Sequence, residues 1–392
     1  MTITGDAKIG VIGAGTMGTG IAQVAATQGH HVYLYDSFSE QLKKSEAGLK
    51  KILNRQIEKG RMTEEEVSGI LSRIEFVDNI TMYGDCSFVI EAVVENPDVK
   101  KDVFSRLEGI VSKDCILASN TSSLSIASIS AALKKPERFL GVHFFNPAPL
   151  MKLVEIIPGI PTEQKFTDAA RELIRSWDKI TVKAKDTPGF ICNRVARPFY
   201  GEALRIYEEG IADAATIDWA MKEIGGFKMG PFELMDLIGH DVNYEVTCSV
   251  FEAFYYDPRF KPSFAQKRMV EAGWLGRKTG RGFYDYREGA NNPEPVKDKE
   301  LGQTIFDRIL VMLMNEASDA VFMKIATVED VDLAMQNGVN YPKGLLKWAD
   351  ESGLHNVLDQ MTALQVEYRE DRYRPNPMLK KLVAEGKNFY DF

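Results

Sequence analysis

The sequence predicts an α/β domain built on a mainly parallel sheet, followed by two all-α domains of which the second is a degenerate repeat of the first. Three observations carry this prediction. Short apolar runs alternate with helical patterns up to about residue 183, the pattern beyond residue 187 is helical, and parts of the helical pattern recur at an offset of 114 residues. The expected domains are residues 1–186, 187–290 and 300–392.

Composition narrows the class of protein. The 392 residues are 44% hydrophobic and 27% charged, as in ordinary globular proteins, and no apolar run is long enough to span a bilayer. The net charge of −8 argues against a nucleic-acid binder, and a first strand near residue 8 leaves no room for a targeting segment. Cys86, Cys115, Cys192 and Cys248 lack metal-type spacing, so we expect four buried thiols, no metal and a cytoplasmic protein.

A glycine-rich turn follows the first apolar run, residues 8–12. Gly13, Gly15 and Gly18 form a Gly-x-Gly-x-x-Gly motif that opens a helical pattern from Met17 to about Thr27. Gly13 permits the tight turn, Gly15 lets backbone N–H groups approach a pyrophosphate, and Gly18 lets helix and strand pack closely. The helix N-terminus favours an anion. The motif therefore predicts a Rossmann-like dinucleotide site, with Met17 among its contacts.

The second apolar run, "HVYLYD", ends on an acid 23 residues after Gly13. The carboxylate of this residue, Asp36, would accept hydrogen bonds from the adenosine ribose hydroxyls and repel a 2′-phosphate. No arginine stands in "DSFSE" to receive such a phosphate. The predicted cofactor is NAD.

A long polar helix follows, and three of its basic residues share one face. Lys51, Arg55 and Lys59 have the spacing i, i+4, i+8. Two interpretations remain open for them. The face is either an ordinary solvated helix surface or a landing site for a phosphate-rich ligand tail.

Polar residues also follow the next two buried strands. "FVIEAVVEN" leads to Glu95, and Lys100 opens the next helix. "DCILASNTSS" delivers its last four residues, Asn120, Thr121, Ser122 and Ser123, at a strand end. Because ligands in open α/β sheets sit beyond the carboxyl ends of the strands, these residues are site candidates. The alternative is that they cap the following helix.

"GVHFFNPAPLMKLVEII", residues 141–157, reads as a hairpin around a proline-rich turn. His143 and Glu155 are equidistant from Pro149, so a hairpin centred there places them opposite each other. A carboxylate on one imidazole nitrogen fixes the tautomer and stabilises the imidazolium. The pair therefore predicts a general base, and Asn146 lies in the adjacent turn.

These segments resemble the L-3-hydroxyacyl-CoA dehydrogenase family of β-oxidation and related pathways. The resemblance rests on "VIGAGTMGTGIA", "EAVVEN", "ASNTSSL", "GVHFFNPAPLMKLVEII", "DTPGFICNR", "GPFELMDLIG" and "GRKTGRGFYDY", in this order, and covers residues 8 to about 286. It implies NAD-dependent oxidation of a 3-hydroxyacyl-CoA to the 3-oxoacyl-CoA. The default substrate is a short linear acyl group such as 3-hydroxybutyryl.

The resemblance also implies residue roles. His143 would be the base and Glu155 its orienting acid, and Ser122 and Asn193 would hydrogen-bond the substrate oxygens, with Asn146 in support. Three further positions, Glu95, Lys100 and Asn120, would contact the cofactor. The position of Lys59 lies near the CoA nucleotide in the family, which favours the ligand interpretation of the basic face.

The helical repeat keeps some residues and loses others. At the offset of 114, residues in the first copy recur unchanged in the second: Arg194, Glu202, Ala203, Asp218, Ala220, Met221, Gly230, Asp236 and Gly239 return as Arg308, Glu316, Ala317, Asp332, Ala334, Met335, Gly344, Asp350 and Gly353. Asn193 is replaced by Asp307, so the second copy is expected to be structural. Single-copy family members dimerise through this unit. A tandem copy predicts a monomer with an internal pseudo-dimer, and a homodimer is the alternative.

Other functions remain open at this point. The acyl group could be dicarboxylic, as in the 3-hydroxyadipyl-CoA of aromatic-acid breakdown. A sugar-acid (gulonate) dehydrogenase would need no CoA, and the basic face of Lys51, Arg55 and Lys59 speaks against it. A non-catalytic NAD-binding protein would have no use for the pair of His143 and Glu155.

Overall fold

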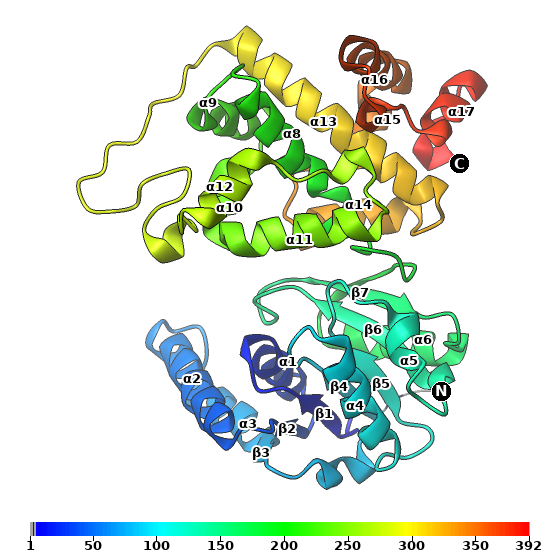
Figure 1. Ribbon diagram of the computed structural model, residues 1–392. Coiled ribbons are helices and arrows are strands. Elements are labelled where there is room, and N and C mark those ends of the chain that lie inside the picture. The colour runs from blue at the N-terminus through cyan, green and yellow to red at the C-terminus, as the bar shows by residue number, and fades with distance from the viewer. Residues whose placement is uncertain (1–2, 4, 392) are drawn as a thin grey trace. The chain divides into compact units, whose positions relative to one another are not determined.

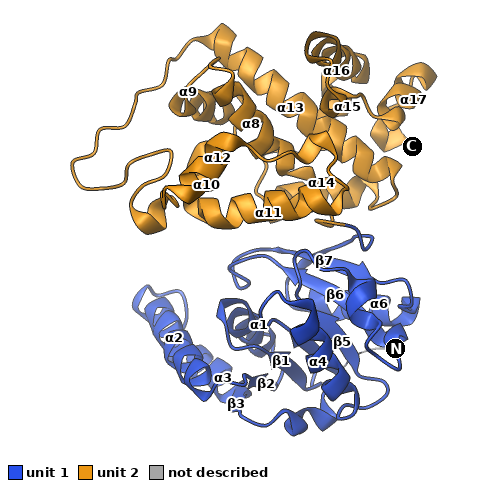
Figure 2. Ribbon diagram, viewed as in Figure 1, with its two compact units in different colours: residues 1–187 blue, residues 188–392 orange. Residues whose placement is uncertain are grey.

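A computed structural model gives the fold and describes residue 3 and residues 5–391. The chain divides into two compact units, Met1–Thr187 and Pro188–Phe392, which Figure 2 colours separately. The first unit is α/β and the second is helical (Figure 1), so the predicted order of an α/β domain followed by helices is confirmed. The further division of the helical part into residues 187–290 and 300–392 stays a prediction.

The first unit is built on one sheet of eight strands in the order β3-β2-β1-β4-β5-β6-β7-β8. Neighbouring strands are parallel except β6 and β7, which are antiparallel. The first six strands have the order of two mononucleotide-binding halves, with the switch point between β1 and β4. The strands are β1 (Ile9–Ile12), β2 (Val32–Tyr35), β3 (Ile74–Val77), β4 (Phe88–Glu91), β5 (Ile116–Ser119), β6 (Phe139–Phe144), β7 (Leu153–Pro158) and β8 (Ile180–Lys183).

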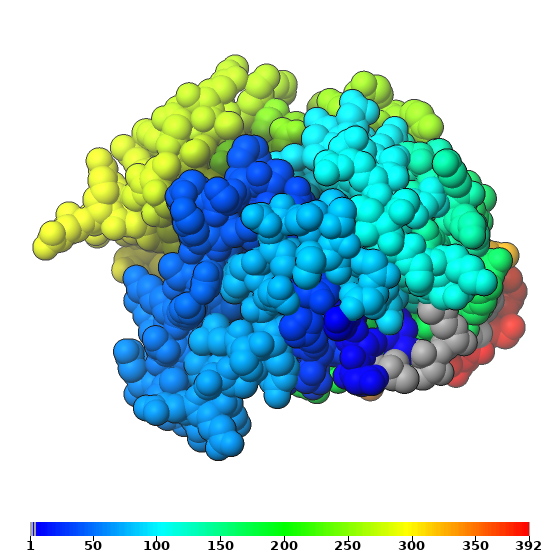
Figure 3. All heavy atoms as spheres, turned by 90° about the horizontal axis from the view of Figure 1, so that it is seen from below, coloured from blue at the N-terminus to red at the C-terminus, as the bar shows by residue number. Residues whose placement is uncertain are grey.

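Helices cover this sheet and bury its central strands. The four residues of β1 and the four of β5 are all buried, as in a parallel sheet covered on both faces. Helices α2 and α3 pack against each other beside β3. Their atoms, in blue, lie toward the lower left of the face that Figure 3 shows. The helices are α1 (Thr16–Thr27), α2 (Ser39–Glu58), α3 (Glu64–Arg73), α4 (Pro97–Glu108), α5 (Ile126–Ser130) and α6 (Gln164–Ser176), with 3-10 turns η1 (Ile80–Asp85) and η2 (Pro136–Arg138).

The second unit contains both copies of the helical repeat. The first copy has α7 (Cys192–Val195), α8 (Arg197–Glu208), α9 (Ala214–Trp219), the π-helical η3 (Ala220–Ile224), α10 (Pro231–Ile238), α11 (His240–Ala253), η4 (Pro258–Phe260), α12 (Phe264–Glu271) and η5 (Arg277–Thr279). The second has α13 (Lys299–Phe322), α14 (Val328–Gly338), α15 (Leu345–Ser352), α16 (Leu354–Tyr368), η6 (Asp371–Tyr373), α17 (Pro377–Glu385) and η7 (Phe389–Asp391). An extended segment leads from residue 287 to α13, where the sequence predicted a linker (Figure 1). Among the described residues, no helix is both long and apolar enough to cross a membrane.

Reciprocal ion pairs join the two copies. The guanidinium of Arg194 donates to Glu316 at 2.6 Å, and that of Arg308 donates to Glu202 at 2.7 Å. At the offset of 114 the two arginines are equivalent and so are the two glutamates, so each arginine binds the glutamate of the other copy. This exchange is the signature of an isologous interface, which a two-fold symmetric dimer would have between two chains.

The repeat also keeps its helix-capping carboxylates. Asp218 accepts hydrogen bonds from two backbone N–H groups at the start of α10, at 2.9 and 2.8 Å. Asp332 does the same at the start of α15, at 2.8 and 2.9 Å. A β-carbon at Gly230 or Gly344 would lie 2.3 and 2.4 Å from the respective carboxylate. These residues recur because they cap and pack the same helices in both copies.

One expectation about the cysteines is wrong. Cys86, Cys115 and Cys192 are buried as predicted, but Cys248 is only partly buried. It lies on α11, of which only His240, Asn243 and Val250 are buried, so much of this helix faces solvent.

Candidate functional site

The glycine-rich turn between β1 and α1 has the shape of a pyrophosphate cradle. A β-carbon at Gly13, where φ is +99°, would lie 2.5 Å from the carbonyl oxygen of Ala92, and one at Gly18 would lie 1.7 Å from that of Gly13. Gly15, by contrast, has nothing within 4 Å of such a position, and the N-terminus of α1 has no side-chain cap. The first N–H groups of the helix therefore adjoin open space in which an anion fits. Met17 lies partly buried beside this turn.

Asp36 follows β2 and is held in a fixed orientation. Its Oδ2 accepts a hydrogen bond from the backbone N–H of Ala14 at 2.8 Å, and its Oδ1 accepts one from Phe38 at 3.0 Å. The carboxylate is only partly buried and lies next to the glycine turn. An ionised carboxylate has about four acceptor positions, so it can also accept from ribose hydroxyls.

A buried network at the ends of β4 and β5 contains a residue that the sequence interpretation missed. Glu91 is fully buried; its Oε1 accepts from Lys100 Nζ at 2.6 Å, and its Oε2 accepts from Ser119 Oγ at 2.7 Å. The ammonium of Lys100 also lies 3.2 Å from Glu95 Oε2. Lys100 is therefore fixed between two carboxylates at the first turn of α4. The missed signal was an acid that closes an apolar strand, "FVIE", before the strand-end loop.

Glu95 organises the loop after β5. Its Oε1 accepts hydrogen bonds from Thr121 Oγ1 at 2.6 Å and from the backbone N–H groups of Ser122 and Ser123 at 3.0 and 3.2 Å. Burial pushes the pKa of Glu95 upward, but the charge of Lys100 and these hydrogen bonds outweigh it and lower the pKa below its usual value. Glu95 therefore stays ionised and keeps the loop in place.

The remaining residues of this loop have structural contacts. Asn120 Oδ1 accepts the backbone N–H of Phe144 at 2.8 Å and so ties β5 to the end of β6. The alternative interpretation, that residues 120–123 cap the next helix, is wrong, because Ser125 is the N-cap of α5 and accepts from the N–H of Ser128 at 3.2 Å. Thr121 instead accepts from Leu124 N–H at 2.9 Å and shapes the loop that carries Ser122.

The predicted hairpin is present, and it pairs the two expected residues. β6 and β7 are antiparallel with His143 opposite Glu155 in the register. The His143 Nδ1 lies 2.7 Å from Glu155 Oε2, with the histidine 6% exposed and the glutamate fully buried. An ionised carboxylate can only accept, so Nδ1 carries the hydrogen and Nε2 has the lone pair. The imidazole also packs against the ring of Phe145, 4.6 Å between centroids.

The turn between β6 and β7 is held from two sides. Lys179, just before β8, donates from Nζ to the carbonyl oxygens of Ala148 and Met151 at 2.6 and 2.8 Å. On α1, a β-carbon at Gly20 would lie 3.2 Å from Pro149 Cδ, so the absence of a side chain lets this helix approach the turn closely. Asn146 is exposed at the start of the turn. The hairpin is thus fixed against the dinucleotide helix.

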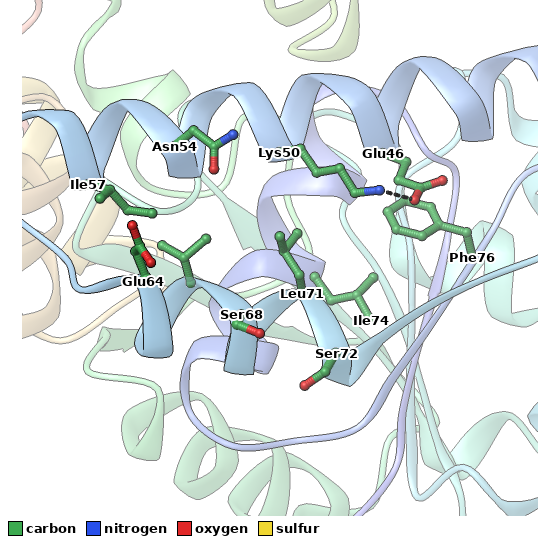
Figure 4. A pocket seen from close by; sticks show the side chains of 11 residues that line it. Glu46, Lys50, Asn54, Ile57, Glu64, Ser68, Leu71, Ser72, Ile74 and Phe76 are labelled. Atoms are coloured by element: carbon green, nitrogen blue, oxygen red, sulfur yellow. Dashed lines mark hydrogen bonds and ion pairs between the residues drawn. The ribbon is translucent and has the colours of Figure 1, made fainter.

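The other predicted site residues belong to other elements of the chain. Asn193 belongs to the second unit, in α7. Lys51 and Arg55 are exposed on α2, and Lys59 is exposed directly after it. Their side chains form no hydrogen bond or ion pair with the part of the chain that the structure describes. A pocket of about 660 Å³ is lined by residues of α2, α3 and β3 (Figure 4), with Lys50 paired to Glu46 at 2.6 Å on its wall. The three basic residues do not line this pocket.

Comparisons with known proteins agree with this geometry. Residues 8–187 match the family profile described as "3-hydroxyacyl-CoA dehydrogenase, NAD binding domain". Two segments, residues 189–286 and 305–389, both match "3-hydroxyacyl-CoA dehydrogenase, C-terminal domain". The second match coincides with the degenerate repeat.

Individual relatives cover most of the chain. 3-Hydroxyadipyl-CoA dehydrogenase of Escherichia coli K12 is 37% identical and covers 95% of this chain and 96% of its own. 3-Hydroxybutyryl-CoA dehydrogenase of Bradyrhizobium diazoefficiens is 43% identical over 74% of this chain and 98% of its own. A crystal structure described as 3-hydroxybutyryl-CoA dehydrogenase from Escherichia coli K12 superposes with a TM-score of 0.91 at 37% identity, covering 97% of this chain and 99% of that one. The chain belongs to the 3-hydroxyacyl-CoA dehydrogenase family and is an NAD-dependent 3-hydroxyacyl-CoA dehydrogenase.

Proposed function

We propose that the protein oxidises short-chain (S)-3-hydroxyacyl-CoA, such as 3-hydroxybutyryl-CoA, to the 3-oxoacyl-CoA in a reversible reaction, with His143 as general base. The observation that carries this proposal is the buried contact of 2.7 Å between His143 and Glu155 at the carboxyl-end region of the NAD-binding sheet. A buried imidazole with its own carboxylate is prepared to receive a proton.

The residues divide the chemistry between them. NAD, when bound, supplies the acceptor for the hydride that leaves C3 of the substrate. His143 removes the hydroxyl proton at Nε2, while Glu155 stabilises the positive charge that appears on the ring. Ser122 and Asn193 hydrogen-bond the substrate oxygens, which stabilises negative charge that develops there. In the reverse direction, the same imidazolium returns the proton.

The remaining predicted residues form the cofactor and CoA sites. Gly13, Gly15 and Gly18 receive the pyrophosphate, Asp36 the adenosine ribose, and Lys100 with Glu95 the nicotinamide end. Lys51, Arg55 and Lys59 attract the phosphates of CoA. Their exposure and lack of an acidic partner among the described residues support this role, since an anion can approach them without displacing a carboxylate.

A dicarboxylic acyl group is a second candidate substrate. The relative that acts on 3-hydroxyadipyl-CoA covers 95% of this chain, including both helical segments. Arg197, a buried arginine of the helical unit, also favours an acyl group that ends in a carboxylate, because it has no carboxylate partner among the described residues.

We also infer that the protein is a monomer in solution. The reciprocal pairs of Arg194 with Glu316 and of Arg308 with Glu202 support this, because the second copy already occupies the surface that a partner chain would use.

The decisive experiment follows NADH absorbance after mixing the protein with acetoacetyl-CoA. The wild type should oxidise NADH, and His143→Gln should lose most turnover while its affinity for NADH, measured by fluorescence, stays the same. The glutamine keeps the polarity and approximate size of the imidazole but cannot accept the proton. Turnover of His143→Gln within tenfold of the wild type would rule out the base assignment, and no turnover of any 3-oxoacyl-CoA by the wild type would rule out the function.

A further inference from the structure

The helical unit contains a buried arginine that the mechanism above does not use. Arg197 opens α8 and is 7% exposed. Its Nη1 donates to Thr247 Oγ1 at 3.2 Å, its guanidinium lies 4.9 Å from the centre of the Tyr200 ring, and its Nε has no hydrogen-bond partner. It has no ion pair with a carboxylate in residues 5–391, whereas Arg194 and Arg308 each have two. A buried charge without a counter-charge is costly to a fold.

A second buried polar atom lies near this arginine. The hydroxyl of Tyr341 has no hydrogen-bond partner among the described residues, and the ring is 5% exposed. Its ring packs against that of Phe199, 5.6 Å between centroids, and Phe199 follows Arg197 by two residues on α8. Burial lowers the pKa of the arginine and raises that of the tyrosine. Two buried donors without a hydrogen-bond partner, both packed around the start of α8, match a group with oxygen acceptors and a negative charge.

The internal repeat shows that packing does not require these residues. At the offset of 114, Arg197, Tyr200 and Thr247 correspond to Val311, Met314 and Met361. All three counterparts are buried, at 2, 3 and 0% exposure. The same helices therefore pack with an apolar cluster in the second copy, where no substrate donor is present. The first copy has a cation in its place, at a cost in stability that a ligand can offset.

We propose that Arg197, with Tyr200 and Tyr341 beside it, binds the terminal carboxylate of a dicarboxylic 3-hydroxyacyl-CoA and so determines acyl specificity. The inference rests on the proposed function, because it takes Asn193 as the residue that binds the substrate oxygen. α7 and α8 join through Ala196 in helical conformation, so Arg197 follows Asn193 by about one turn, a rise of roughly 6 Å.

The length of a six-carbon diacid suits this spacing. Three bonds separate the hydroxyl-bearing C3 from the carboxyl carbon, a reach of roughly 4 Å when extended, and the arginine side chain covers the remainder. A guanidinium presents parallel N–H donors that match the two oxygens of a carboxylate. A methyl group at the same place would leave the arginine without a partner.

The test compares two substrates of equal length, 3-hydroxyadipyl-CoA and 3-hydroxyhexanoyl-CoA, which differ in a carboxylate against a methyl group. The proteins are the wild type, Arg197→Val, which copies Val311 of the repeat, and Arg197→Lys, which keeps the charge. Arg205→Val, eight residues further along α8, is the matched control for loss of one positive charge. The quantity measured is the ratio of kcat/KM for the adipyl substrate to that for the hexanoyl substrate.

The wild-type ratio should exceed about 10. Arg197→Val should lower this ratio by roughly 10- to 100-fold, as expected for loss of a charge-assisted hydrogen bond. The ratio for Arg197→Lys should lie between these two values, and Arg205→Val should keep the wild-type ratio. A ratio in Arg197→Val within threefold of the wild type overturns the assignment. Equal losses on both substrates also overturn it, because they indicate a contact with CoA or a packing defect.

Binding to the wild type gives an independent measurement if Arg197→Val does not fold. Adipyl-CoA and hexanoyl-CoA lack the hydroxyl group and cannot react, so they act as competitive inhibitors. Adipyl-CoA should inhibit at least tenfold more tightly, and equal inhibition overturns the proposal. Turnover of the hexanoyl substrate alone would refute the carboxylate site and leave the dehydrogenase function intact, whereas no turnover of either substrate would refute both.

Discussion

Replacing Glu155 by Gln tests the central contact of the site. The substitution removes the negative charge but keeps the size of the side chain and an oxygen that can accept the hydrogen of His143 Nδ1. The buried hairpin should therefore fold as before. What is lost is the attraction between the carboxylate and the imidazolium that forms during turnover.

The structure sets the size of this loss. The two hydrogen-bonded atoms, His143 Nδ1 and Glu155 Oε2, are 2.7 Å apart, and both residues are at most 6% exposed. Taking about 4 Å between the centres of charge and an effective dielectric constant of about 20 gives an interaction of about 4 kcal/mol. One power of ten in rate corresponds to about 1.4 kcal/mol, so kcat should fall by roughly 10²- to 10³-fold.

The assay is oxidation of NADH by acetoacetyl-CoA at saturating concentrations of both, with NADH affinity measured separately by fluorescence. Glu163→Gln is the matched control, because Glu163 makes the same kind of carboxylate contact with Lys165, but at the surface, where its side chain is 50% exposed. The control should retain wild-type turnover. A loss of less than tenfold in Glu155→Gln, with normal NADH affinity, would refute the assignment of Glu155 as the partner of a catalytic base.

Three further outcomes are expected. Asp36→Ala should weaken NAD binding by roughly 10- to 100-fold, because the hydrogen bonds to the ribose are lost, and should affect NADP binding much less. An unchanged preference for NAD over NADP, in a titration with both cofactors, would contradict the role of this residue. Burial lowers the pKa of Lys179 to about 8, so between pH 8 and 10 the unfolded chain binds more protons than the folded chain. The free energy of unfolding should therefore rise with pH in this range, by up to about 1.4 kcal/mol per pH unit. In urea denaturation Lys179→Met should lack this rise, and the same dependence on pH in the variant and the wild type would argue against burial of the Lys179 ammonium. Light scattering should give the mass of one chain, 43.9 kDa, and twice that value would refute the internal pseudo-dimer as a substitute for a partner.

Local patterns in the sequence were sufficient to predict several features of the first unit. The motif of Gly13, Gly15 and Gly18 predicted the strand, turn and helix, because only glycine permits the close backbone approaches at Gly13 and Gly18. The distances of His143 and Glu155 from Pro149 predicted their pairing, since the register of a hairpin follows from its turn. Both predictions depend on residues that are close in sequence.

Contacts between distant segments were not predictable in the same way. Glu91 was overlooked because its partners, Lys100 and Ser119, come from another helix and another strand, and nothing in the strand "FVIE" identifies them. Ser125 rather than residues 120–123 caps α5, because Glu95 engages the loop before the helix begins. Competition among several polar groups for one partner is decided by position in three dimensions.

The helical repeat shows most clearly the difference between features that follow from the sequence and contacts that depend on the tertiary structure. The amino-acid sequence was enough to identify the two copies and the replacement of Asn193 by Asp307 in the second. The structure was needed to show that Arg194 and Arg308 each bind the glutamate of the other copy and that Arg197 has no carboxylate partner among the described residues. The physical reason is that spacing along a chain fixes which residues share a helix face, whereas the partner of a buried charge depends on which distant helix packs against that face.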